Sequence, residues 1–175
     1  MNLPNRLTLL RVIMVPFFIV FYIKGYFLIS FVLFVLASLT DLLDGHIARK
    51  RNLISNFGKI MDPLADKILV YSAFCLMVGN GLVPAWMLIV ILVREFAVSG
   101  MRTVAASEGI VVAADLSGKI KTVLQMIAVP MLILTGVIIS DVWFTLSMAM
   151  LWASLIMTVY SGIQYIYKNR KVFSL

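Results

Sequence analysis

The sequence predicts an all-α integral membrane protein with six transmembrane helices and both termini in the cytoplasm. Of its 175 residues, 62% are apolar and only 13% are charged, whereas soluble globular domains are about half apolar and about a quarter charged. A spanning helix needs roughly 20 mostly apolar residues, so a chain of this length holds about six spans with short loops. The single cysteine excludes an intramolecular disulfide scaffold. We therefore expect one membrane domain over residues 1–175.

The apolar runs place the six spans in order along the chain. The first pair lies at 7–23 and 27–43, the second at 62–78 and 84–106, and the third at 122–139 and 142–167. Within each pair the runs are separated by turn-forming residues, at 24–25, 79–81 and 140–141. These turn signals agree with six helices.

The distribution of Lys and Arg predicts the orientation. With the N-terminus in the cytoplasm, all but two of the 15 basic residues fall on the cytoplasmic side; Lys24 lies outside and Arg94 lies within a span. This asymmetry follows the positive-inside rule. The net charge of +7 therefore indicates orientation and attraction for membrane lipids and phosphate groups, and no partner of the nucleic-acid class is expected.

Four of the eight acidic residues lie between positions 41 and 66, at the predicted cytoplasmic ends of the second and third helices. Asp41 and Asp44 are three residues apart, and Asp62 and Asp66 are four apart, so each pair shares one helix face. Acids near the hydrocarbon are costly, and converging carboxylates repel unless a cation neutralises them. Carboxylates are the ligands that Mg²⁺ or Mn²⁺ prefers, and four of them can bridge two such ions. A proton or cation pathway is the competing interpretation.

The residues that share a helix face with Asp44 indicate what this site binds. Gly45 and Ala48 open a shallow channel where a ligand reaches the backbone. Arg49, at the end of the channel, suits a phosphate fork. Together with a metal, these features predict a pyrophosphate site. Close helix packing by Gly45 and Ala48 is the alternative.

In sequence order, the residues of this region read Asp41-x2-Asp44-Gly45-x2-Ala48-Arg49-x8-Gly58-x3-Asp62-x3-Asp66. This pattern resembles the signature of the CDP-alcohol phosphatidyltransferase family at every fixed position. The six-span layout and the opening segment 2–8 also resemble family members, so the likeness extends over essentially the whole chain. It implies the CDP-alcohol phosphotransferase fold, a homodimer, and transfer of a phosphatidyl or similar group from a CDP-linked donor to an alcohol, with release of CMP.

The resemblance also implies roles for individual residues. Asp41, Asp44 and Asp62 would hold the metals, and Asp66 would be both a metal ligand and the proton acceptor. The residues implied to bind CDP-diacylglycerol are Asn5, Thr8, Gly45, Ala48, Arg49, Ser55 and Gly58.

Segments 92–95 and 118–125 resemble the bacterial phosphatidylglycerophosphate synthases of this family. This likeness implies CDP-diacylglycerol as donor, sn-glycerol 3-phosphate as acceptor, and a bacterial cell membrane with the active site facing the cytoplasm. The residues themselves also favour a phosphorylated acceptor, because cations occur beyond the metal site. The candidates for binding glycerol phosphate are Arg94, Arg102, Lys119 and Lys121. A purely structural pair of Arg94 with Glu95, and a purely topological role for the two lysines, are the alternatives.

Two other functions remain open. A related enzyme could use the same chemistry on inositol phosphate, serine or phosphatidylglycerol. A small transporter could use the aspartates as an ion pathway, although acids near the bilayer midplane and an internal repeat would then be expected.

Overall fold

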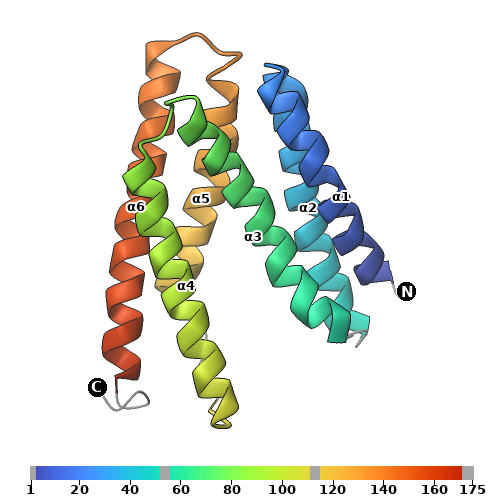
Figure 1. Cartoon of the computed structure of the whole chain (residues 1–175), viewed down its shortest axis with the longest axis vertical. Coiled ribbons are helices and arrows are strands. Elements are labelled where there is room, and N and C mark those ends of the chain that lie inside the picture. The colour runs from blue at the N-terminus through green and yellow to red at the C-terminus, as the bar shows by residue number, and fades with distance from the viewer. Residues whose placement is uncertain (1–2, 52–55, 111–114, 171–175) are drawn as a thin grey trace.

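The computed structural model is a bundle of six α-helices (Figure 1). It describes residues 3–51, 56–110 and 115–170, with side chains from residue 7 onward except at 41–60, 62, 63 and 66. The helices are α1 (Leu3–Ile23), α2 (Phe27–Arg51), α3 (Asn56–Gly79), α4 (Ala85–Ser107), α5 (Leu116–Leu134) and α6 (Asp141–Asn169). There is no strand in the described part of the chain, so the all-α class is confirmed.

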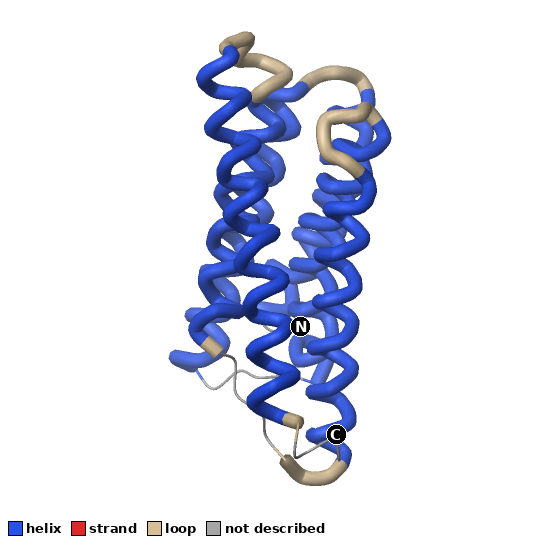
Figure 2. The backbone as a smooth tube through the Cα atoms, turned by 90° about the vertical axis from the view of Figure 1, so that its left-hand side faces the viewer, coloured by secondary structure: helices blue, strands red, loops and turns tan. Residues whose placement is uncertain are grey.

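Consecutive helices run in opposite directions (Figures 1 and 2). The start of α1, the end of α2, the start of α3 and the end of α6 lie at one end of the bundle, which we call the motif end. Three short connections close the opposite, far end. Two of them turn through Gly25 (φ 78°) and Gly81 (φ 75°), because this left-handed conformation strains residues with a side chain. The chain therefore turns where the sequence predicted.

Several helices differ from their predicted bounds at the motif end. α2 continues from the predicted end at 43 to Arg51, and α3 begins at Asn56 instead of 62. The apolar runs mark only the hydrocarbon-facing part of a helix, and backbone hydrogen bonding continues into the polar segment beyond it. In contrast, α5 ends at Leu134, five residues before the predicted end, where Thr135 and Gly136 begin the connection to α6.

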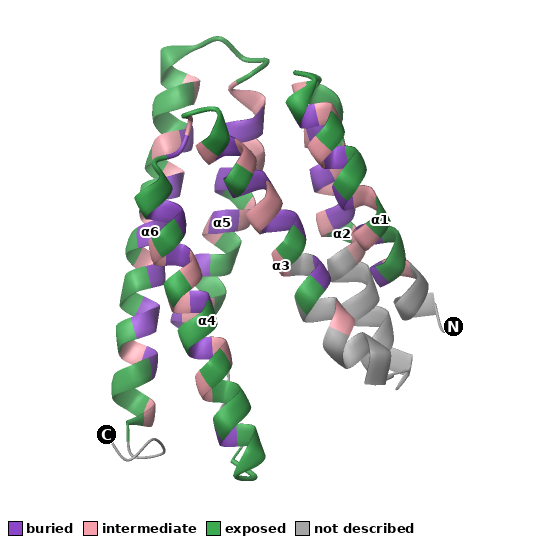
Figure 3. Cartoon of the chain, in the orientation of Figure 1, coloured by how far each residue is buried: buried purple, intermediate pink, exposed green. Residues whose placement is uncertain are grey.

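The surface of the bundle is strongly apolar. Large exposed side chains such as Phe96, Leu116 and Ile163 are each more than 60% accessible, and exposed residues lie along the outside of the helices (Figure 3). An apolar surface of this extent is typical of contact with lipid or with other proteins. By length and composition, α5 and α6 of the described chain could cross a membrane, and three shorter apolar stretches occur at Leu7–Ile23, Phe27–Thr40 and Lys67–Gly79. The complete six-span layout stays a prediction.

Two kinds of packing hold the helices together. Phe18, Phe34 and Phe74 are buried in an apolar core to which all six helices contribute, α3 and α5 most. α6 packs most extensively on α5, and it buries small hydroxyl residues such as Ser154 and Thr158. Each of these two hydroxyls donates a 2.7 Å hydrogen bond to a carbonyl of the preceding turn. Small residues whose polar groups are satisfied within the helix allow close helix approach in an apolar environment.

Candidate functional site

The backbone brings the two halves of the aspartate motif to the same end of the bundle. Asp41 and Asp44 lie in the last three turns of α2, and Asp62 and Asp66 lie in the first three turns of α3. The two helices are antiparallel neighbours that contact each other, and their ends meet at the motif end (Figure 1). This arrangement places four carboxylate-bearing positions together, as a shared metal site requires.

The predicted metal site depends on those four positions. Their side chains lie outside the described ones, as do the side chains of Asn5, Gly45, Ala48, Arg49 and Gly58, and Ser55 lies outside the described residues altogether. Among the side chains that the structure does describe, no group of three or more His, Cys, Asp or Glu could hold a metal ion. The donor set of the motif is chemically suited to a hard divalent ion, because all four donors are carboxylates.

Two fully buried polar residues of α1 lie next to the motif. Thr8, a predicted nucleotide contact, has no exposed surface, and Arg11 is likewise completely buried. The Arg11 Nε donates a 3.2 Å hydrogen bond to the Ala37 carbonyl oxygen, one helical turn before Asp41. From the sequence, Arg11 was predicted only to be one of the basic residues on the cytoplasmic side. Its position within an apolar run is the signal that could have singled it out, since buried charges need specific partners.

Three basic side chains converge on Glu95, and we call Lys67, Arg94 and Lys121 the basic cluster. The Arg94 Nη1 donates to Glu95 Oε1 at 2.7 Å, and the Lys121 ammonium donates to the same oxygen. Lys67 Nζ lies 3.9 Å from Glu95 Oε2 and donates a 2.8 Å hydrogen bond to Ser99 Oγ. The side chains of Lys121, Glu95 and Arg94 are only 5%, 11% and 12% exposed.

This basic cluster connects three helices, two of which are otherwise apart. Lys67 belongs to α3, Arg94 and Glu95 to α4, and Lys121 to α5, although the backbones of α4 and α5 are not in contact along the described chain. Small residues make room for Arg94, since a Cβ on Gly162 would lie 3.0 Å from its Cγ and one on Gly118 would lie 3.3 Å from its Nη2. The long side chains therefore fill a polar space between three helices.

A cavity of about 50 Å³ lies beside Glu95, and it is lined by Lys67, Lys121 and Gln125 among others. Gln125 Nε2 and Arg94 Nε are buried and have no hydrogen-bond partner among the described atoms. Buried donors are normally paired. Within the described part of the chain, the space around Glu95 thus combines more positive than negative charge with donors that lack acceptors.

The other two predicted acceptor residues lie elsewhere. The Arg102 guanidinium carbon is 5.4 Å from the centre of the Tyr165 ring on α6, and Lys119 is exposed. Arg102 follows Arg94 by eight residues, which is two turns plus about 80° of rotation at 3.6 residues per turn. The structure therefore brings Arg94 and Lys121 together, adds Lys67, and leaves Arg102 and Lys119 apart from them.

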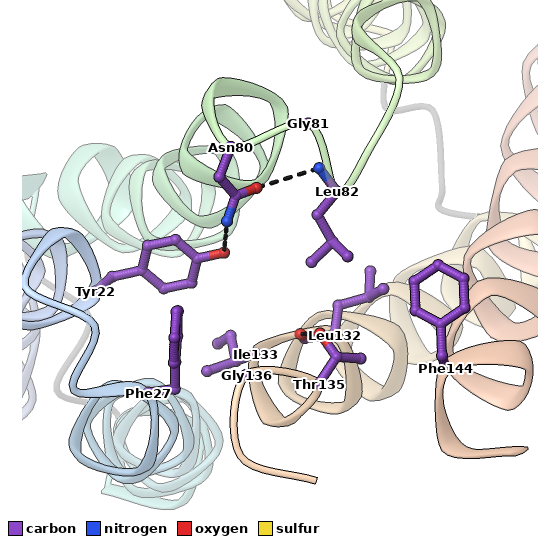
Figure 4. Close-up of a pocket in the computed structure, with 10 residues that line it drawn as sticks. All are labelled: Tyr22, Phe27, Asn80, Gly81, Leu82, Leu132, Ile133, Thr135, Gly136 and Phe144. Carbon is purple, nitrogen blue, oxygen red and sulfur yellow. Dashed lines mark hydrogen bonds between the residues drawn. The ribbon is translucent and has the colours of Figure 1, made fainter. Parts of the chain in front are cut away.

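A cavity of about 350 Å³ lies at the far end among the three turns (Figure 4). There the Asn80 amide donates to the Tyr22 hydroxyl at 3.0 Å and accepts from the Leu82 N–H at 3.2 Å. None of the residues that line it carries a formal charge. It therefore lacks the groups that acid, base or metal chemistry needs, and the candidate site is at the motif end.

Comparison with known proteins identifies the family. The sequence profile described as CDP-alcohol phosphatidyltransferase matches residues 1–160. The chain belongs to this family. The predicted family resemblance, based on the aspartate motif, is confirmed.

Individual relatives agree with this family. A Bacillus subtilis protein named CDP-diacylglycerol--glycerol-3-phosphate 3-phosphatidyltransferase is 44% identical, and the match covers 96% of this chain and 95% of that protein. A Rickettsia felis protein of the same name is 38% identical over 98% of this chain and 97% of its own. A Mycobacterium tuberculosis protein named probable phosphatidylglycerophosphate synthase is 34% identical over 94% of this chain and 80% of its own. The chain is therefore similar over nearly its whole length to transferases of phospholipid synthesis.

Proposed function

We propose that the protein transfers the phosphatidyl group of CDP-diacylglycerol to sn-glycerol 3-phosphate, giving phosphatidylglycerol phosphate and CMP. Relatives named for this reaction are 38% and 44% identical over nearly the whole chain. The structural observation that carries the proposal is the position of the basic cluster. Lys67 directly follows Asp66 in α3. One member of the basic cluster, which suits an acceptor phosphate, is therefore the sequence neighbour of the proposed catalytic base.

The donor binds at the motif end. Its acyl chains remain in the bilayer, and its pyrophosphate lies at the ends of α2 and α3, where Gly45 and Ala48 leave the backbone accessible and Arg49 pairs with phosphate oxygens. Asn5, Thr8, Ser55 and Gly58 complete this binding site. Asp41, Asp44, Asp62 and Asp66 would hold Mg²⁺ or Mn²⁺ as a pair of ions, which would supply the positive charge that offsets the pyrophosphate and the leaving CMP.

Asp66 acts as the base. It accepts the proton of the glycerol 1-hydroxyl, whose oxygen attacks the phosphorus that carries diacylglycerol, and the bond from that phosphorus to CMP breaks. Arg94 and Lys121 hold the phosphate of the acceptor, which orients the hydroxyl towards Asp66. Arg102 and Lys119, which lie apart from the basic cluster, assist in attracting the acceptor from the cytoplasm.

The same proposal includes the cellular setting. The protein is a multi-pass homodimer in a bacterial cell membrane, with six spans, both termini in the cytoplasm and an active site that opens there. The alternating directions of the six helices and the location of both termini at the motif end support this topology, because the predicted cytoplasmic basic residues gather at that end.

The test is a substrate panel with purified protein. CDP-diacylglycerol and Mg²⁺ or Mn²⁺ are supplied with glycerol 3-phosphate, inositol phosphate, serine or phosphatidylglycerol, and CMP release is measured. We expect release that depends on glycerol 3-phosphate. Preferential release with another of these alcohols would assign the protein to a different branch of the family, and no release with any of them would contradict the proposal.

A further inference from the structure

The basic cluster carries more positive charge than its surroundings balance. Lys67, Arg94 and Lys121 contribute three positive charges, whereas Glu95 is the only acidic side chain that pairs with them among the described residues. The neighbours that complete the lining of the adjacent cavity, such as Tyr71, Thr122 and Gln125, are uncharged. Among the described side chains, two positive charges are therefore left over in a largely buried place, and buried like charges repel strongly unless an anion joins them.

The unpaired donors point to the same kind of ligand. Gln125 follows Lys121 by one turn on α5, both residues line the 50 Å³ cavity, and the Gln125 amide nitrogen has no partner among the described atoms. Arg94 Nε, which lies outside the lining of this cavity, is also buried without a partner among the described atoms. A cavity of this size holds one or two water molecules, since a water takes up about 30 Å³. Water could accept these hydrogen bonds, but it could not supply two negative charges.

From this charge balance we infer that Glu95 is the resident counter-ion of an anion site, and that it makes the site selective for a doubly charged phosphate monoester. The inference rests on the proposed function, in which such a monoester is the acceptor. A phosphate monoester carries about 1.5 to 2 negative charges at pH 7, which matches the charge that Glu95 leaves uncompensated. A phosphodiester supplies one charge and a neutral alcohol supplies none, so neither completes the site.

Glu95 acts through its neighbours and is a positioning residue. One of its oxygens accepts hydrogen bonds from both Arg94 and Lys121, so it keeps two mutually repelling cations together before the acceptor arrives. Lys67 is the most accessible member of the basic cluster, with 33% of its side chain exposed. Its ammonium moves from Ser99 and Glu95 to admit the phosphate, because the present cavity is too small for the ester. Glu95 then competes with the bound phosphate, which weakens binding and lets the charged product leave.

The experiment compares acceptor and donor kinetics in charge variants. Glu95→Gln removes the competing charge, so the KM for glycerol 3-phosphate and the inhibition constant of inorganic phosphate should each fall about tenfold, the factor that corresponds to 1.4 kcal/mol. The KM for CDP-diacylglycerol should stay within about twofold, and kcat should fall because product leaves slowly. Glu95→Asp keeps the charge and should bind the acceptor as the wild type does. Glu108→Gln, at an exposed acid after α4, is the matched control.

A double variant separates charge from structure. Lys121→Gln alone lowers the net charge of the site and should raise the KM for glycerol 3-phosphate. Adding Glu95→Gln restores the net charge of two, so the double variant should recover much of the acceptor affinity. It also removes both partners of the Lys121–Glu95 ion pair, and therefore remains testable if the Glu95→Gln protein does not fold.

Three results would overturn the role of Glu95 and leave the proposed function intact. The first is a Glu95→Gln variant whose KM for the acceptor is unchanged. The second is an equal change of that KM in Glu95→Asp and Glu95→Gln. The third is a double variant that binds the acceptor no better than Lys121→Gln does. Parallel changes in the KM of donor and acceptor would also overturn it, because a structural role affects both substrates. In contrast, a wild-type protein that releases no CMP with glycerol 3-phosphate would refute the proposed function itself.

Discussion

Lys119 and Lys121 are two residues apart on α5, yet they should differ strongly in their effect on the reaction. Lys121 is 5% exposed and donates to Glu95, whereas Lys119 is exposed. Residues two apart on a helix point in different directions. In the proposed reaction only Lys121 reaches the acceptor phosphate in a desolvated place, so replacing each lysine in turn by Gln separates a buried binding contact from a surface charge.

The magnitude follows from the environment of each group. A hydrogen bond to a charged partner contributes about 1.5 to 3 kcal/mol, which corresponds to about a 10- to 100-fold higher KM for glycerol 3-phosphate in Lys121→Gln. An exposed charge near the entrance contributes little, so Lys119→Gln should raise that KM by no more than about fivefold. Glu95 keeps its bond to Arg94 in the Lys121 variant, which limits the damage to the fold.

The assay measures CMP release against glycerol 3-phosphate concentration at saturating CDP-diacylglycerol, and then against the lipid at saturating acceptor. We expect the two lysine variants to differ by a factor of ten or so in acceptor KM and to share the wild-type KM for the lipid. Equal acceptor KM values in Lys119→Gln and Lys121→Gln would refute the reasoning, since they would show that burial beside Glu95 does not matter for acceptor binding.

Three further predictions follow from the packing and the motif. Gly162→Val should crowd Arg94, raise the acceptor KM and destabilise the protein by about 1 to 3 kcal/mol. Gly100→Val is the control and should have a much milder effect, because a Cβ there would meet nothing within 4 Å. Equal acceptor KM values in the two variants would contradict the placement of Arg94. Arg11→Met removes a fully buried donor to the Ala37 carbonyl and should cost about 1.5 to 3 kcal/mol, so an unchanged thermal midpoint in detergent would count against its structural role. Chelation of divalent ions should abolish CMP release, and Mg²⁺ or Mn²⁺ should restore it; full activity in excess chelator would exclude the metal role of the aspartates.

The sequence predicted the general course of the chain because hydrophobic runs and turn residues are local signals. Six helices and the turns at Gly25 and Gly81 appear where the pattern placed them. The helix ends differ, since α2 continues to Arg51 and α3 begins at Asn56, and the polar residues there give no hydropathy signal. The spacing of the aspartates also indicated which helix ends meet, because each pair lies on one face.

The composition of the basic cluster depends on tertiary packing and could not be predicted in full. Lys67 lies beside Glu95 only because α3, α4 and α5 converge there. This contact between distant helices cannot be inferred from the spacing of residues along the sequence. Arg102 was predicted to bind the same acceptor as Arg94, but the helical rotation between them places its guanidinium over the Tyr165 ring. Arg11 shows the same limit, since its hydrogen bond to Ala37 joins residues 26 positions apart.

The most direct test of the central claim is to identify the products made by the purified protein and by its Asp66→Asn variant. With CDP-diacylglycerol, isotope-labelled glycerol 3-phosphate and a divalent ion, mass spectrometry should detect labelled phosphatidylglycerol phosphate and an equal amount of CMP. Asp66→Asn should form neither product while CDP-diacylglycerol still binds, because the proton acceptor is lost and three aspartates remain to hold the metal. Labelled product from Asp66→Asn at the wild-type rate, or CMP without labelled lipid from the wild type, would contradict direct transfer to the acceptor with Asp66 as the base.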